Sequence, residues 1–168
     1  GCVALGFIGF VALNSYIYQE KQADGAPDEK NATYLIEGAP VTLVNGTAET
    51  ATEGSAVTTV TQYFGNALRT DLNADGREDV VFLLTQQGGG SGTFFYVVPA
   101  LNTVNGYVGG TAFFIGDRIA PQNINLDENG TTIIVNYADR KPDEPFTADP
   151  SVGVSVWLTF DAGSNSFV

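Results

Sequence analysis

Apolar residues are concentrated at the start of the chain, and beyond that point they recur in short runs separated by polar turns. Residues 1–13 carry no polar side chain, and two tyrosines flanking an isoleucine follow after a short polar break. A helix over residues 1–18 is about 27 Å long, close to the roughly 30 Å hydrocarbon thickness of a bilayer. The pattern therefore predicts an N-terminal hydrophobic helix over 1–18. Residues 19–31 are charged and contain Gly and Pro, which predicts a polar linker.

The rest of the chain, residues 32–168, has the pattern of a single β-domain. Residues 33–46 indicate a hairpin with its turn near 37–40. Residues 79–87 and 93–101 are continuous apolar runs, which are typical of central strands covered on both faces. With the remaining apolar runs they predict about eight to ten strands, arranged as an antiparallel β-sandwich-like or curved-sheet domain. The predicted fold class is therefore mainly β.

Two local predictions complete this picture. Residues 56–68 fit a half-buried strand, and a short helix within residues 52–68 is the alternative. Trp157 stands between valines and leucines, so we expect its large apolar side chain in the core.

The amino-acid composition excludes several classes of function but adds little to the predicted fold. Nineteen acidic residues against seven basic ones give a formal net charge of −12, which repels phosphate backbones and argues against a nucleic-acid partner. The chain has no histidine and one cysteine, which excludes Ser-His-Asp and Cys-His nucleophilic systems. Carboxylate-only chemistry stays open, but no catalytic pair stands out. We therefore expect a protein that is not an enzyme, in an extracellular setting rich in salt or calcium.

Residues 71–79, with the sequence DLNADGRED, carry the sharpest chemical signal. Alternating oxygen-bearing side chains before a glycine are the pattern of a calcium loop, because Ca²⁺ takes several oxygen ligands around a sharp turn. The candidate ligands are the side chains of Asp71, Asn73, Asp75 and Asp79 and the carbonyl of Arg77. Phe82 stands where an EF-hand has its glutamate, and the loop runs into a predicted strand. The pattern resembles the calcium loops of dockerins and FG-GAP-type propeller repeats, which implies a structural Ca²⁺. An ordinary Asx-rich turn is the alternative.

The apolar N-terminal segment is predicted to mediate assembly. Its arrangement resembles that of type IV pilins and related filament subunits, in which a hydrophobic N-terminal helix passes from the membrane into the filament core. Gly1 and Leu5 depart from that family's usual phenylalanine and acidic residue. A simple membrane anchor, lipidation at Cys2 and a β-strand donated to a neighbour's sheet are the alternatives. The predicted assembly residues are Val3, Leu5, Phe7, Ile8, Phe10, Val11, Leu13, Tyr16 and Ile17.

The body of the chain, with the stretches NATYLIEG, DLNADGREDVVFLLTQ and GTFFYVV, resembles a group of uncharacterised membrane-anchored bacterial surface proteins. That resemblance implies a location and no activity. The predicted function is a non-catalytic extracellular structural subunit that self-associates through residues 1–18, resides in the membrane before assembly and exposes its acidic β-domain. The alternative is a monomeric, single-pass anchored surface domain that binds a ligand or another envelope protein.

Overall fold

The computed structural model describes residues 28–168. The predicted helix over 1–18 and most of the predicted linker lie outside these residues. Within them the protein is mainly β and its paired strands are antiparallel, which confirms the predicted class. In chain order the elements are η1 (Glu29–Asn31), β1 (Thr33–Ile36), β2 (Ala39–Thr42), β3 (Thr47–Ala51), β4 (Thr58–Thr70), β5 (Asp79–Gln87), β6 (Phe94–Thr103), β7 (Gly106–Gly109), β8 (Phe113–Asp117), β9 (Ala120–Leu126), β10 (Thr132–Asp139), β11 (Val152–Asp161) and β12 (Ser166–Phe167).

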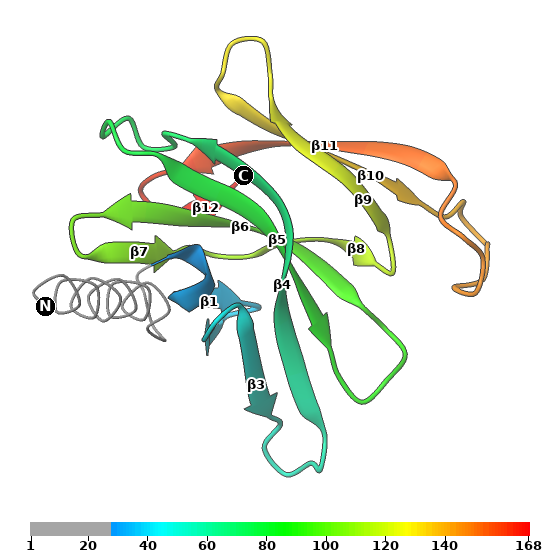
Figure 1. Cartoon of the computed structure of the whole chain (residues 1–168). Helices are drawn as coiled ribbons and strands as arrows, with labels where there is room; N and C mark the ends of the chain where they lie inside the picture. The colour runs from blue at the N-terminus through cyan, green and yellow to red at the C-terminus, as the bar shows by residue number, and fades with distance from the viewer. Residues whose placement is uncertain (1–27) are drawn as a thin grey trace, which may run out of the picture.

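The strands form three sheets that lie in layers (Figure 1). The largest has the order β3-β4-β5-β6-β7, with β8 also paired to β6. A four-stranded sheet of order β12-β11-β10-β9 covers one of its faces, and the β1–β2 hairpin covers the other. The fold is therefore sandwich-like, with a small third layer added to the central sheet.

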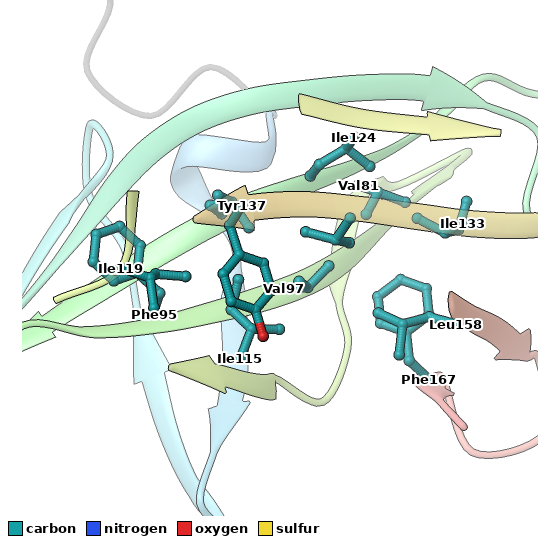
Figure 2. Close-up of a cluster of buried hydrophobic side chains, with 12 residues drawn as sticks. Val81, Phe95, Val97, Ile115, Ile119, Ile124, Ile133, Tyr137, Leu158 and Phe167 are labelled. Carbon is teal, nitrogen blue, oxygen red and sulfur yellow. The ribbon is translucent and has the colours of Figure 1, made fainter. Parts of the chain in front are cut away.

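The first core fills the space between the central sheet and the four-stranded sheet. Figure 2 shows its side chains converging from β5, β6 and β8 on one side and from β9 to β12 on the other. Val81 and Val97 of the central sheet and Leu158 of β11 are fully buried there. The alternation in β10, where every second residue from Ile133 to Tyr137 is buried, shows how a period of two directs one face of a strand inward.

The second core lies under the β1–β2 hairpin. Phe82 and Tyr34 meet there edge to face, with ring centroids 5.5 Å apart, and Tyr63 packs against Phe82 at 4.9 Å. Adjacent residues of β5 thus face different cores, since Val81 and Leu83 belong to the first and Phe82 to the second. Covered on both faces, β5 is buried from Asp79 to Thr85, as its continuous apolar run predicts.

The hairpin that closes the second core turns at the predicted place. Glu37 and Gly38 connect β1 and β2, with φ angles of 51° and 82°. Positive φ at both central residues is the geometry of a type I′ turn, whose twist matches that of the flanking strands. Asn45 and Gly46 repeat this geometry before β3, with φ angles of 51° and 82°.

Residues near the start of the described chain are held by the domain. Glu29 lies in η1, within the predicted linker, and is buried; its Oε1 pairs with Nη2 of Arg69 at 2.9 Å. The hydroxyl of Tyr34 donates to the carbonyl oxygen of Glu29 at 2.6 Å. Burial of Tyr34 raises its pKa far above the ordinary value, and the charge of Glu29 adds to the effect.

Three details differ from the sequence-based predictions. The described residues form twelve strands, more than the eight to ten expected. The alternative of a short helix in residues 52–68 is wrong, because most of them belong to β4 and β3 ends just before them. The prediction of a core Trp157 is also wrong. The side chain lies on the outer face of the four-stranded sheet with 63% of its surface exposed. Its neighbours Val156 and Leu158 point toward the first core, so the period-two alternation of the strand turns Trp157 outward.

Candidate functional site

The predicted calcium loop connects two neighbouring strands of the central sheet. β4 ends at Thr70 and β5 begins at Asp79, and these two residues face each other in the antiparallel register. The backbone between them enters the left-handed region at Ala74 and Gly76, with φ angles of 59° and 83°. Glycine adopts this conformation without a steric penalty, so the sharp turn at Gly76 is as the motif predicts.

Side-chain oxygens hold the backbone of this loop in place. Asp71 accepts two backbone N–H groups, from Asp75 at 3.1 Å through Oδ1 and from Gly76 at 2.8 Å through Oδ2. Oδ1 of Asn73 accepts the same Asp75 N–H at 3.2 Å. These are Asx-type hydrogen bonds, which satisfy backbone donors that no strand can reach.

Asp75 lies at the exposed tip of the loop. Its Oδ1 accepts the backbone N–H of Arg77 at 2.8 Å, and its Oδ2 receives Nδ2 of Asn73 at 3.3 Å and lies 3.5 Å from Nη1 of Arg77. The backbone hydrogen bond from Arg77 lowers the pKa of Asp75, and the Asn73 amide and Arg77 guanidinium act in the same direction. The carboxylate is therefore ionised at neutral pH.

Asp79 has a different environment, since it is completely buried. One carboxylate oxygen accepts the backbone N–H of Leu72 at 2.8 Å, and the other accepts that of Asn102 at 2.8 Å. Burial raises the pKa of Asp79, while these two hydrogen bonds oppose the rise. Asp79 thus ties the loop to β6 and has both oxygens engaged.

The loop partly fits a bound calcium ion. Asp71, Asn73 and Asp75 are brought together near the surface, and hard Ca²⁺ binds carboxylate and amide oxygens of this kind. Arg77 lies in the same exposed tip, whereas Asp79 is turned into the domain. Within residues 28–168, no group of three or more His, Cys, Asp or Glu residues is arranged to hold a metal ion. A calcium ion here would use the three outer side chains.

A second Asx loop faces the first across a small hollow and was missed from the sequence. In the β9–β10 turn, Oδ1 of Asp127 accepts the backbone N–H groups of Thr131 and Thr132, both at 2.8 Å. These bonds, the one from Thr132 above all, lower the pKa of Asp127. The hollow has a volume of about 210 Å³ and is lined by both loops, through Asp71 and Gly130 among others. The sequence DENG of this turn was a readable Asx-turn signal.

The predicted assembly residues cannot be placed on the fold, because all of them lie outside the described residues. They are Val3, Leu5, Phe7, Ile8, Phe10, Val11, Leu13, Tyr16 and Ile17. From residue 28 onward, the chain contains no helix with the length and apolar character needed to cross a membrane.

No protein-family model matches the chain, and neither a curated protein nor a solved structure matches it. The likenesses to pilins and to calcium loops therefore remain predictions that rest on the residues themselves.

Proposed function

We propose that this chain is a non-catalytic structural subunit of an extracytoplasmic, pilus-like assembly. Residues 1–18 pack with other copies, and the acidic β-domain stays on the outside. The observation that supports this proposal best is the joining of a long apolar segment to a domain of net negative charge. Burying roughly 15 apolar side chains yields on the order of 20–40 kcal/mol before ordering costs, which is ample for polymerisation.

The carboxylates of the domain support a structural role. Asp71, Asp79 and Asp127 each accept two backbone N–H groups. Asp117 accepts the N–H of Thr93 and pairs with the adjacent Arg118. In these places the acidic side chains hold loops together, and this use accounts for them without catalysis.

The test of assembly replaces Phe7 and Phe10 with serine in the full chain. We expect the unmodified chain to sediment as large species in detergent-free buffer and the double variant as small ones. The matched control replaces two exposed phenylalanines of the domain, Phe64 and Phe114, which have 46% and 49% of their surface exposed. That control should still assemble. An unmodified chain that stays small and monodisperse without detergent would refute the proposal and favour the anchored monomer.

We also propose that the outer part of the loop, Asp71, Asn73 and Asp75, binds a stabilising Ca²⁺. The clustering of these three side chains near the surface and the left-handed turn support this, because the ion would need little rearrangement of the backbone. We expect added calcium to raise the midpoint of thermal unfolding of the unmodified chain and a chelator to reverse the rise, since an ion that binds only the folded state stabilises it. In Asp75→Ala the midpoint should no longer respond to calcium. Asp161→Ala changes a different Asx loop, in which Oδ1 of Asp161 accepts the backbone N–H of Gly163 at 3.1 Å, and there the response should persist. If calcium does not change the midpoint of thermal unfolding of the unmodified chain, the loop is an ordinary Asx turn and the calcium proposal is wrong.

A further inference from the structure

Strand β11 has one long side without a partner strand among the described residues. It pairs with β10 along its length, but on its other side β12 reaches only Phe160 and Asp161. The N–H and the C=O of Thr159 both point to this other side, where they bond Val168 at 2.9 Å. Because alternate residues of an antiparallel strand point their backbone groups the same way, those of Gly153, Ser155 and Trp157 also point there. They have no partner within residues 28–168.

Four other edge strands carry features that discourage pairing with a further strand. β9 contains Pro121 and an irregularity in its register, β2 contains Pro40, and β3 is a short strand with the charged Glu49. β7 is shorter still. Prolines, charges and short length are the usual protections of an exposed edge. The open stretch of β11, residues 152–158, has none of them.

Charge makes this stretch suitable for a second copy of the same chain. The sequence from Ser151 to Phe160 contains no charged residue, although the chain as a whole has a net charge of −12. Two copies of so acidic a protein repel each other over most of their surface. An uncharged edge is where their backbones approach at the lowest electrostatic cost, so screening by salt should favour the approach.

The side chains of the open stretch are complementary to themselves under two-fold symmetry. If Ser155 lies opposite Ser155 of a second copy, the outward N–H and C=O groups of Gly153, Ser155 and Trp157 all find backbone partners on that copy. The same register places Trp157 across from the second copy's Gly153. Space is free over Gly153, because a Cβ added there would meet no atom within 4 Å. An aromatic side chain covering a cross-strand glycine is a known stabilising arrangement at a sheet edge.

We propose that two copies of this protein join antiparallel along β11, with the two-fold axis at Ser155. The four-stranded sheets of both copies then become one continuous sheet. On its outer face each indole of Trp157 covers the opposite Gly153, and on its inner face Val154 lies opposite Val156 of the other copy. This interface belongs to the folded domain and does not depend on the assembly proposed for residues 1–18.

Disulfide trapping in the full chain tests the register. Cys2 is first replaced by serine, and the protein is kept in non-ionic detergent so that residues 1–18 are shielded. Ser155→Cys places two thiols opposite each other at a Cα separation of about 5.5 Å, within the range of a disulfide. The matched control is Thr159→Cys, on the same strand and face. Its thiols would lie roughly 26 Å apart in the proposed dimer.

We expect oxidation to give at least ~10-fold more covalent dimer from the Ser155→Cys chain than from the Thr159→Cys chain, because only the former meets disulfide geometry. The result should persist when Phe7→Ser and Phe10→Ser are added, which separates it from the N-terminal assembly. Equal or negligible cross-linking of the two chains overturns the inference.

A second measurement uses Trp157 as a reporter, since it is the only tryptophan. Its emission should shift to shorter wavelength as protein or salt concentration rises, because the indole becomes buried against the second copy. Ser155→Asp sets two carboxylates opposite each other and should weaken the dimer by up to ~5-fold, because like charges directly opposite destabilise strand pairing. Thr159→Asp adds the same charge far from the two-fold axis and should therefore weaken the dimer less than Ser155→Asp does. An emission spectrum that does not change with concentration contradicts the proposal.

Discussion

Replacing Asp79 by alanine tests how the loop between β4 and β5 is held. The carboxylate is completely buried, and its two oxygens accept the backbone N–H groups of Leu72 and Asn102, both at 2.8 Å. Alanine leaves both donors, which are partly buried, without this acceptor. A fully buried donor that loses its partner costs about 1–3 kcal/mol. Because water reaches these two donors in part, the substitution should destabilise the domain by about 2–5 kcal/mol, below the full cost of two buried donors.

Asparagine at position 79 should destabilise the domain less than alanine does. Its carbonyl oxygen accepts one of the two N–H groups, while its NH₂ group faces the other and cannot accept from it. We expect Asp79→Asn to cost about 1–3 kcal/mol, less than alanine, because only one donor is left unpaired. Removal of the buried charge, whose desolvation raises the pKa of Asp79, offsets part of this cost.

The assay is urea-induced unfolding of the full chain in non-ionic detergent, followed by circular dichroism, with Glu78→Ala as control. Glu78 is adjacent and exposed, so its replacement removes the same formal charge without unpairing a buried donor. The control should change the free energy of unfolding by no more than about 0.5 kcal/mol. If Asp79→Ala costs no more than Glu78→Ala, the two backbone hydrogen bonds do not hold the loop and the reasoning is wrong.

Three further predictions concern the sheets and the loop at Arg118. Phe82→Ala should cost about 3–5 kcal/mol in urea unfolding, because the ring is fully buried between Tyr34 and Tyr63; an exposed control, Phe64→Ala, should cost less. Gly109→Ala should destabilise the domain, because a Cβ there would lie 2.3 Å from the carbonyl oxygen of Thr33, whereas Gly153→Ala, with no atom within 4 Å, should be close to neutral. Asp117→Asn should cost about 1–2 kcal/mol at pH 7, since Asp117 pairs with Arg118 and accepts the N–H of Thr93 in a partly exposed setting. These bonds, the one from Arg118 above all, hold the pKa of Asp117 below its ordinary value of 3.8, so the stabilisation is present above pH 3.8 and the difference between the two chains should shrink as the pH falls below it.

The central strands were predictable because a long apolar run in a β-protein has few alternatives. Residues 79–87 alternate between two cores, so both faces of β5 need apolar side chains, and the sequence shows no polar face. The hairpin turn at Glu37 and Gly38 was predictable for a local reason, since the turn chemistry lies in adjacent residues. The number of strands was underestimated, because short edge strands such as β7 and β12 carry too little pattern to be recognised.

The position of Trp157 follows from the alternation of side chains along β11. From Val152 to Phe160 the apolar residues Val154, Val156 and Leu158 occupy one face, and Trp157 falls on the other face with Ser155 and Thr159. A period of two therefore indicates an outward tryptophan. The size and hydrophobicity of the residue suggested the core instead, and this reasoning was wrong because strand alternation decides the face.

Asp79 shows what spacing in a motif cannot reveal. Its place in the motif matches that of a calcium ligand, and its neighbours Asp71 and Asp75 lie at the surface as the motif predicts. One of its two hydrogen-bond donors, Asn102, is distant in the sequence and reaches Asp79 only through the pairing of β5 with β6. Such a contact depends on the tertiary structure, so the sequence alone could not separate a ligand from a loop anchor.

The two proposed contacts between copies permit different kinds of assembly. Pairing along β11 uses the same surface on both partners, and a contact of this isologous type closes after two copies. It cannot produce a filament by itself. Residues 1–18 are the part of the chain proposed to contact several copies. A repeating contact between different surfaces extends into a filament when its rotation does not close a ring. If both contacts form, the repeating unit of the assembly is the β11 dimer. Ser155→Asp should then change the spacing of subunits in the assembly. Phe7→Ser combined with Phe10→Ser should instead abolish the assembly and leave β11 dimers.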